Sequence, residues 1–331
     1  MIPGFIDLQV NGAAGVDFTS GDLAASDIAK VANLLYLRGV IGFCPTVITT
    51  SMERYEGCLP VLARWRGDGP MAQNLGVHIE GPFINPEDGP RGVHDREFVC
   101  PASIEVYERL RKWCDDRVAI LTLAPEVPGA LELIEHVTRS SKTVVSIGHT
   151  NADARTIHEA IDAGATSATH LGNGISSTID RFRNPLWPML ADDRLFAMCV
   201  TDGFHQPEEM LRVFVNVKAP SHFIVTSDLM PLAGLPPGEY EVADRAVVLE
   251  PNGWLHCKET DQLAGSARDM LECMNVLAGL GSLTESELEG IGFHNPLSLL
   301  GIESTSHQFD NHVDLRFVDG LFRVGDVRQQ D

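Results

Sequence analysis

Short apolar runs rich in β-branched residues alternate along this chain with stretches that carry apolar residues at helical spacing. Eight such runs precede residue 228: GFIDLQV, VIGFCPTVI, NLGVHI, VAILTLA, TVVSIGH, ATSATHL, FAMCVT and HFIVTS. Between them, apolar residues recur every three or four positions, for example over 128–140 and 152–164. Strands joined by crossover helices pair in parallel, and eight such units fit a closed barrel better than an open doubly wound sheet. The sequence therefore predicts an α/β fold of the (β/α)8 TIM-like barrel type.

The pattern changes after the eighth run. Alternation with a period of two and a Pro-Asn-Gly turn predict a β-hairpin insertion near residues 237–257. Helical spacing resumes in the segments 265–280, 284–293 and 295–301. The sequence HVDLRFVDGLFRV then predicts one hairpin that turns through Val318-Asp319-Gly320. We expect a catalytic barrel over residues 1–305 and a C-terminal tail over residues 306–331.

Charge and composition limit the class of partner. The formal net charge of −21 and a pI near 4.9 argue against nucleic acid and anionic membranes, because both require clustered Lys and Arg. No apolar run approaches the roughly 18 residues of a spanning helix, and the start MIPGFIDLQV lacks the regions of a signal peptide. We therefore expect a cytoplasmic enzyme with a small-molecule substrate. The seven cysteines lie far apart without a CxxC pair, which is typical of core thiols.

Polar residues at the carboxyl ends of the predicted strands are the candidate site residues, because the loops there converge over the barrel mouth. They are Asp7, Gln9, Asn11, Glu80, His149, His170, His205 and Asp228. Two imidazoles and one carboxylate are the usual protein ligands of a catalytic Zn²⁺. Glu80, His149 and His170 would fill those places, and Asp228 would then be free to act as the base. A single buried histidine is more often a hydrogen-bonded core group, so the hypothesis depends on the combination.

The motifs PGFIDLQVNG, HIEGPFINPEDGPRGVHD, GHTNA, THLGNG, DGFH, VTSDLMPLAGLPPGEY and LAGSARDM occur in one order along residues 3 to 302. In order and spacing they resemble the N-acetylglucosamine-6-phosphate deacetylases, a branch of the metal-dependent amidohydrolase superfamily. The resemblance implies hydrolysis of the acetamide on C2 of the sugar, a step of amino-sugar catabolism that releases acetate and glucosamine 6-phosphate.

The resemblance also implies roles for individual residues. Glu80, His149 and His170 match the metal ligands of the family, and Asp228 matches its general acid and base. His94, in GVHD, matches the histidine that hydrogen-bonds the substrate carbonyl.

Two residues of the opening motif determine the expected number of metal ions. Many amidohydrolases carry His-x-His after the first strand for a second metal, whereas this chain has Gln9 and Asn11. Neutral amides are poor ligands beside imidazole, so we expect one divalent ion per subunit and no second metal site. Zinc is the expected ion, with iron, manganese and cobalt as alternatives.

Three departures from the family pattern concern the substrate and the tail. Where the family has HL(F/Y)NAM this chain has HLGNGI, so Asn173 is kept while Gly174 stands close to the sugar; Leu263 is a further candidate substrate contact. The phosphate-binding arginine of the family matches Arg183 in DRFRNP, with Arg181 nearly as good a candidate.

Either arginine could act with His205, and in the family this site is completed from the neighbouring subunit, which implies a homodimer. The family's small β-sandwich is expected to be reduced or missing, and a helix, a loop or a second subunit should then cover the edge of the tail hairpin.

Three functions remain open at this point. The leading one is a deacetylase acting on N-acetylglucosamine 6-phosphate. An amidohydrolase of the same mechanism could act instead on another N-acyl amine or on an unphosphorylated amino sugar. A non-catalytic barrel that binds sugar is disfavoured, because Glu80, His149, His170, His94 and Asp228 are all present.

Overall fold

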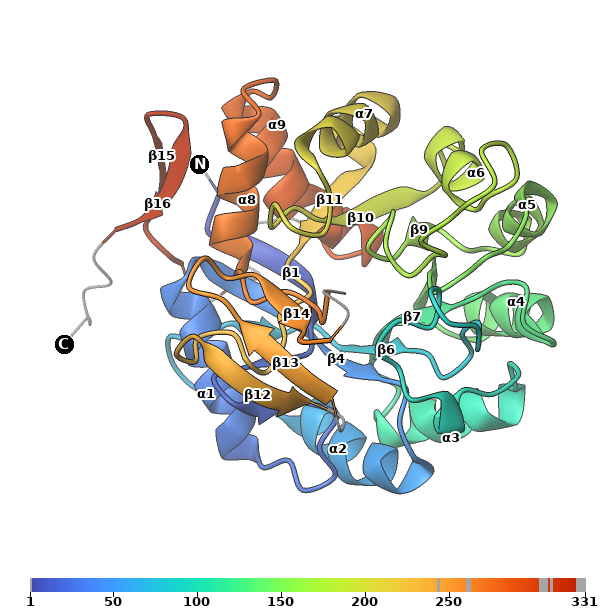
Figure 1. The fold of residues 1–331 in the computed structure, drawn as a ribbon. Helices are drawn as coiled ribbons and strands as arrows, with labels where there is room; N and C mark the ends of the chain where they lie inside the picture. Colours follow the sequence, from blue (N-terminus) through green and yellow to red (C-terminus); the bar gives the residue numbers. More distant parts are fainter. Residues whose placement is uncertain (1, 243–244, 260–262, 304–308, 310–311, 326–331) are drawn as a thin grey trace.

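The computed structural model describes residues 2–242, 245–259, 263–303, 309 and 312–325. Its largest sheet has nine strands. Eight of them run parallel in the order β1-β4-β6-β7-β8-β9-β10-β11, with helices outside the ring that they form (Figure 1), and the short β5 (Gln73–Asn74) pairs with β4. The eight strands of the ring are β1 (Phe5–Val10), β4 (Val40–Ile48), β6 (Val77–Glu80), β7 (Val118–Leu123), β8 (Val144–Ile147), β9 (Ser167–Ala168), β10 (Phe196–Val200) and β11 (Phe223–Thr226). Each coincides with one of the eight predicted runs, although β6 extends one residue beyond its run to Glu80, so the barrel prediction is confirmed.

The barrel closes between β11 and β1 through side-chain contacts more than through backbone pairing of the two strands. A single parallel bridge joins Val10 to Leu229. The buried carboxylate of Asp7 accepts hydrogen bonds from the Thr226 hydroxyl at 2.8 Å and from the Ser227 backbone N–H at 3.1 Å. The first and last strands are thus tied at the end where Asp228 follows.

Seven α-helices accompany the strands up to residue 218, and one short 3-10 helix (Arg96–Phe98) follows β6. The α-helices are α1 (Ala25–Leu37), α2 (Met52–Arg64), α3 (Ile104–Trp113), α4 (Ala130–Ser140), α5 (Ala154–Asp162), α6 (Leu186–Ala191) and α7 (Glu208–Lys218). Their starts follow local sequence rules: Asp153, for example, caps α5 by accepting from the Thr156 N–H at 2.9 Å. The same helix buries Ile157, Ala160 and Ile161, which are three and four residues apart and form one face.

The insertion after the barrel forms three antiparallel strands where the sequence predicted a hairpin. They are β12 (Gly238–Val242), β13 (Arg245–Leu249) and β14 (Leu255–Cys257). The third strand follows from the Pro-Asn-Gly turn, after which Leu255 pairs with Leu249. Val247, Leu249 and Leu255 form a small apolar cluster with Met230 and Leu232, two apolar residues that closely follow Asp228. The insertion is therefore anchored beside the candidate site.

The C-terminal part packs against the start of the chain. It contains α8 (Met270–Gly279), α9 (Glu285–Glu289), a π-helical turn (Gly290–His294) and α10 (Asn295–Leu299). The predicted hairpin is present as β15 (Leu315–Val318) and β16 (Leu321–Val324), and its turn residues Asp319 and Gly320 both have positive φ, as a two-residue hairpin requires. No helix of the described residues is long and apolar enough to cross a membrane.

A helix covers the edge of this hairpin. Asn275 of α8 donates to the Phe322 carbonyl at 3.0 Å and accepts from the Phe322 N–H at 2.7 Å. The Phe322 ring packs edge-on against Phe5 of β1, with ring centroids 5.0 Å apart. The expected cover is confirmed, and the cover is helix α8. The expected boundary at residue 305 lies outside the described residues, so the division into barrel and tail stays a prediction.

Candidate active site

A cavity of about 900 Å³ opens at the carboxyl ends of the barrel strands. Residues from the loops after six different strands line it, and the insertion contributes Ala246 and Cys257. The predicted site residues that line it are Asn11, Glu80, His94, His149, His170, Asn173, Gly174, His205, Asp228 and Leu263. Barrel closure thus brings together residues that are more than 200 positions apart in the sequence.

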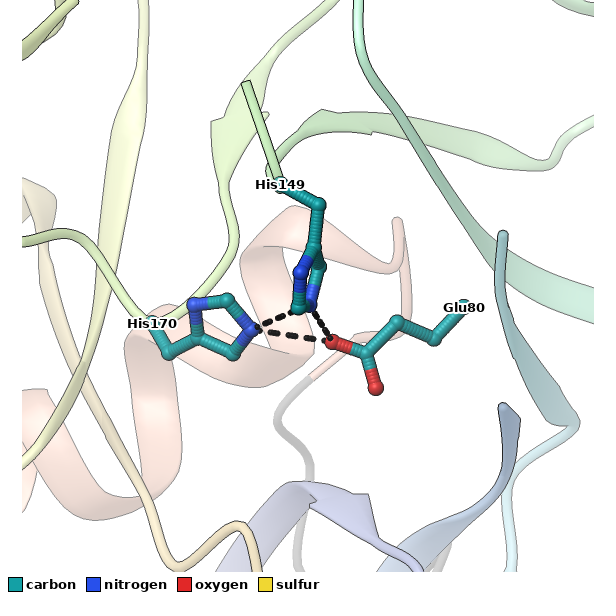
Figure 2. A group of neighbouring side chains, drawn as sticks. All are labelled: Glu80, His149 and His170. Atoms are coloured by element: carbon teal, nitrogen blue, oxygen red, sulfur yellow. Dashed lines mark hydrogen bonds and ion pairs between the residues drawn. The ribbon is translucent and has the colours of Figure 1, made fainter. Parts of the chain in front are cut away.

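The three predicted metal ligands converge on one point (Figure 2). The Glu80 Oε1 atom lies 3.0 Å from His149 Nε2 and 2.9 Å from His170 Nε2, and the two nitrogens are 3.0 Å apart. Glu80 ends β6, while each histidine lies two residues past its strand and has a positive φ, 52° for His149 and 30° for His170. Such values are uncommon for residues other than glycine and occur often at functional sites.

The hydrogen bonds around these side chains favour a bound cation. The Pro90 carbonyl lies 2.7 Å from His149 Nδ1, and because a carbonyl only accepts, that nitrogen carries the hydrogen. The lone pair of His149 Nε2 therefore faces the carboxylate of Glu80, and two lone pairs at this distance require a positive charge between them. Burial would raise the pKa of Glu80, but the close side chains of His149 and His170 hold it well below its ordinary value. The cluster thus fits a divalent cation.

Asp228 lies beside this cluster, held by two amides. Its Oδ1 atom accepts from Asn11 Nδ2 at 2.7 Å and from Gln9 Nε2 at 3.0 Å, and Gln9 Nε2 also lies 3.1 Å from Glu80 Oε1. Burial, together with the negative charge of Glu80, raises the pKa of Asp228 to about 6. Gln9 and Asn11 thus direct their amide groups toward the candidate base. A carboxyl group with this pKa can both accept and return a proton near neutral pH.

His94 and His205 are the other two histidines of the cavity. The ring of His94 packs edge-on against His149 with centroids 4.3 Å apart, and its Nδ1 atom lies next to Thr49. Burial, and then the neighbouring His149, lowers the pKa of His94 well below its ordinary value, so the ring is neutral. His205 donates from Nδ1 to Asp202 at 2.8 Å. Despite burial, that contact lowers the pKa of Asp202, so the pair places an ionised carboxylate behind the imidazole.

Comparison with known proteins identifies the relatives of this chain. A search of protein-family models finds no match. The N-acetylglucosamine-6-phosphate deacetylase of Bos taurus is 34% identical over 330 residues, which cover 96% of this chain and 78% of the relative. That of Bacillus subtilis is 28% identical over 306 residues, with 91% and 76% covered. The chain belongs to the N-acetylglucosamine-6-phosphate deacetylase family.

Solved structures of the family have the same fold. The N-acetylglucosamine-6-phosphate deacetylase from Thermotoga maritima superposes with a TM-score of 0.79 at 26% identity, covering 91% of this chain and 78% of that one. The amidohydrolase barrel expected from the sequence is therefore correct, and the described part of the chain shows the small β domain in reduced form.

The HLGNGI departure from the family pattern has a packing reason. A Cβ atom at Gly172 would lie 2.8 Å from the Met210 methyl and 2.9 Å from Gln206 Nε2, so α7 and the loop before it leave no room for a side chain at this position. Gly174 has a φ of 60° and lies against both His149 and His170. The cavity wall next to the metal cluster therefore carries no side chain at either Gly172 or Gly174.

The two candidate arginines are not part of the cavity wall of their own chain. Arg181 and Arg183 are exposed, in a segment whose Phe182 side chain is 77% exposed. Their role as phosphate ligands stays a prediction, and it requires a partner subunit or a rearrangement of this segment.

Sequence reasoning missed two residues that hold the site loops. The Glu126 carboxylate accepts from Asn85 Nδ2 at 2.8 Å, from the Asn151 N–H at 2.7 Å and from the Thr150 hydroxyl at 2.5 Å. It thereby joins the loops that follow β6 and β8, including the one that carries His149. Its position after β7, in TLAPE, was the available signal. Arg91 donates to the His94 carbonyl at 2.7 Å, and its place three residues before His94 could have indicated that contact.

Proposed function

We infer that this family member hydrolyses the acetamide of N-acetylglucosamine 6-phosphate to acetate and glucosamine 6-phosphate. The observation that carries this conclusion is the Glu80, His149 and His170 cluster beside Asp228 in one cavity, in a chain that belongs to this family. Two imidazoles and one carboxylate are a typical set of protein ligands for a hydrolytic zinc centre.

We propose zinc as the ion that Glu80, His149 and His170 hold. A bound divalent cation of this kind supplies Lewis-acid chemistry, because it polarises the amide carbonyl and makes a water molecule more acidic. The neutral imidazole donors and single carboxylate suit zinc better than magnesium or calcium, which prefer oxygen ligands.

The residues around the cluster account for the proton transfers. Asp228 takes a proton from the attacking water and later gives it to the departing amine nitrogen. Asn11 and Gln9 both donate to its Oδ1 atom, which leaves Oδ2 free to face the reacting atoms. His94 borders the same cavity and donates a hydrogen bond to the carbonyl oxygen as negative charge develops there.

We further propose that the phosphate binds near His205 and that a second subunit completes its site. His205 borders the cavity, and the Asp202 carboxylate fixes its ring by accepting from Nδ1. An anionic substrate needs such local polar groups in a protein of net charge −21. Arg181, Arg183 and the exposed Phe182 and Trp187 lie in one segment, and apolar side chains exposed beside cations are typical of an interface. The proposed assembly is a homodimer.

The cysteines support a cytoplasmic location. All seven lie in described residues, all are free thiols, and six are buried. Unpaired thiols in this number are typical of proteins that work in a reducing compartment. We propose that the enzyme works there.

The first test compares kcat/KM of the zinc-loaded protein for N-acetylglucosamine 6-phosphate and for N-acetylglucosamine, with the released amine as the readout. A preference of a hundredfold or more for the phosphate corresponds to at least about 2.7 kcal/mol of transition-state binding and would establish a phosphate site. The Asp228→Asn variant is the control and should keep its metal content while losing several orders of magnitude in rate. Equal or absent turnover of both sugars would move the search to other N-acyl amines.

A further inference from the structure

The contacts of His94 determine which of its ring nitrogens carries the hydrogen. Its Nδ1 atom lies 2.8 Å from the Thr49 hydroxyl and 3.3 Å from the Thr49 backbone nitrogen. A backbone N–H can only donate, so Nδ1 must be the acceptor and carries no hydrogen. The hydroxyl of Thr49, which follows β4 and is only 3% exposed, then donates to the same nitrogen.

The hydrogen of the neutral ring is therefore on Nε2. This nitrogen has no hydrogen-bond partner among the described residues, and it is not fully buried. Because His94 borders the cavity and this nitrogen is not fully buried, the geometry points to an Nε2–H group that a substrate in the cavity can reach. His94 thus presents a donor where the proposed reaction develops negative charge.

The neighbouring metal-ligand candidate has the opposite arrangement. At His149 the Pro90 carbonyl accepts from Nδ1, which leaves a lone pair on Nε2 for a cation. The two rings are only 4.3 Å apart, so a donor and a ligand lie side by side in the same cavity. The Pro90 carbonyl makes His149 a ligand through Nε2. The N–H and hydroxyl of Thr49 make His94 a donor through Nε2.

We propose that Thr49 is a positioning residue that holds His94 in the Nε2–H tautomer and so makes it a hydrogen-bond donor to the acyl oxygen of the substrate. The proposal rests on the proposed function for the identity of that oxygen. Gly81 leaves room for the arrangement: a Cβ atom at this position would lie 2.2 Å from the Thr49 hydroxyl oxygen. Any residue larger than glycine at position 81 would therefore displace the Thr49 hydroxyl from its place beside His94.

The test uses Thr49→Val and Thr49→Ser in the zinc-loaded enzyme, with Thr50→Val as the matched control at the next residue. Removal of a whole oxyanion donor costs about 10²–10³ in kcat, so a loosened His94 should cost about tenfold. We expect Thr49→Val to lower kcat by about tenfold with KM within about twofold, and Thr49→Ser to restore kcat. Thr50→Val should leave both parameters near the parent values.

A double-mutant cycle shows whether Thr49 acts through His94. In a His94→Ala background, Thr49→Val should cause no further loss, because the group that it positions is gone. A tenfold loss that persists in that background would overturn the proposal, and so would full activity of Thr49→Val.

A spectroscopic measurement tests the tautomer without turnover. In ¹⁵N-histidine-labelled protein, protonated and unprotonated ring nitrogens have well-separated ¹⁵N chemical shifts, and the signals of His94 are assigned by their absence from His94→Ala. We expect Nδ1 of His94 to be the unprotonated nitrogen. A hydrogen on Nδ1 in the parent enzyme would refute the inference, whereas lack of turnover of N-acetylglucosamine 6-phosphate with the expected spectrum would refute only the proposed substrate.

Discussion

Removal of the Asn11 amide should move the acid limb of the pH–rate profile. Asn11 Nδ2 donates to Asp228 Oδ1 at 2.7 Å, and this bond favours the ionised carboxylate. Hydrogen bonds to charged groups contribute about 1.5–3 kcal/mol, and one pKa unit corresponds to about 1.4 kcal/mol. Loss of the bond in Asn11→Ala should therefore raise the pKa of Asp228 by about 1–2 units.

The sign and the size of the effect follow from the role of Asp228 as base. Burial and Glu80 place the pKa of Asp228 at about 6, so most of it is ionised at pH 7. A rise of about 1–2 units would lower the ionised fraction at pH 7 by about two- to tenfold, while at pH 9 most of the loss would disappear. A bound cation moves both profiles to lower pH, but the difference between them remains.

The assay is kcat/KM for N-acetylglucosamine 6-phosphate from pH 5 to pH 9, with the metal content measured for each sample. Asn275→Ala is the matched control, because Asn275 bonds the tail hairpin through Phe322 and should leave the acid limb in place. An acid limb of Asn11→Ala that stays at the parent pH, or moves to lower pH, would refute the assignment of Asp228 as the titrating base.

Three further predictions concern the metal, the barrel and the dimer. Chelation should lower the Tm and zinc should restore it, since a ligand at about 100 times its Kd stabilises the folded protein by about 2.7 kcal/mol. Glu80→Gln should abolish this zinc-dependent rise. A Tm that changes with neither chelator nor zinc would contradict a metal site at Glu80, His149 and His170. Asp7→Asn should cost about 1–3 kcal/mol in urea unfolding, because one of the buried donors of Thr226 or Ser227 loses its acceptor; unchanged stability would count against closure through Asp7. Phe182→Asp should yield monomers in sedimentation with weaker selection for the phosphate, and an intact dimer would exclude this segment as the interface.

Local patterns of the sequence predicted most of the fold. The alternation of β-branched runs and amphipathic helices gave the eight strands and the barrel, and Asp319 with Gly320 gave the tail hairpin. The insertion was underestimated by one strand, because β14 (Leu255–Cys257) is only three residues long. Short strands carry a weak periodic signal, and the pairing of β14 with β13 depends on the turn between them.

The sequence predicted the main residues of the candidate site but only some of the contacts that hold them in place. Glu80, His149, His170 and Asp228 could be named because parallel strands in a barrel present their carboxyl ends on one side. Glu126 follows β7 in the same way, yet a carboxylate at a strand end does not by itself indicate what it binds. Its partners lie in loops on either side, and only their positions in space show that it holds the loop that carries His149.

The sequence by itself determined which residue types stand at the ends of which strands, because side-chain alternation and helix caps depend on neighbours within a few positions. Only the tertiary structure decided which groups meet. The amide of Gln9 reaches Asp228, 219 positions later, and Thr49 reaches the ring of His94, 45 positions later. Such contacts depend on barrel closure and loop packing. They influence the pKa of Asp228, the candidate base, and determine which ring nitrogen of His94 carries the hydrogen. The chemistry of the site therefore depends on long-range distances that no local pattern specifies.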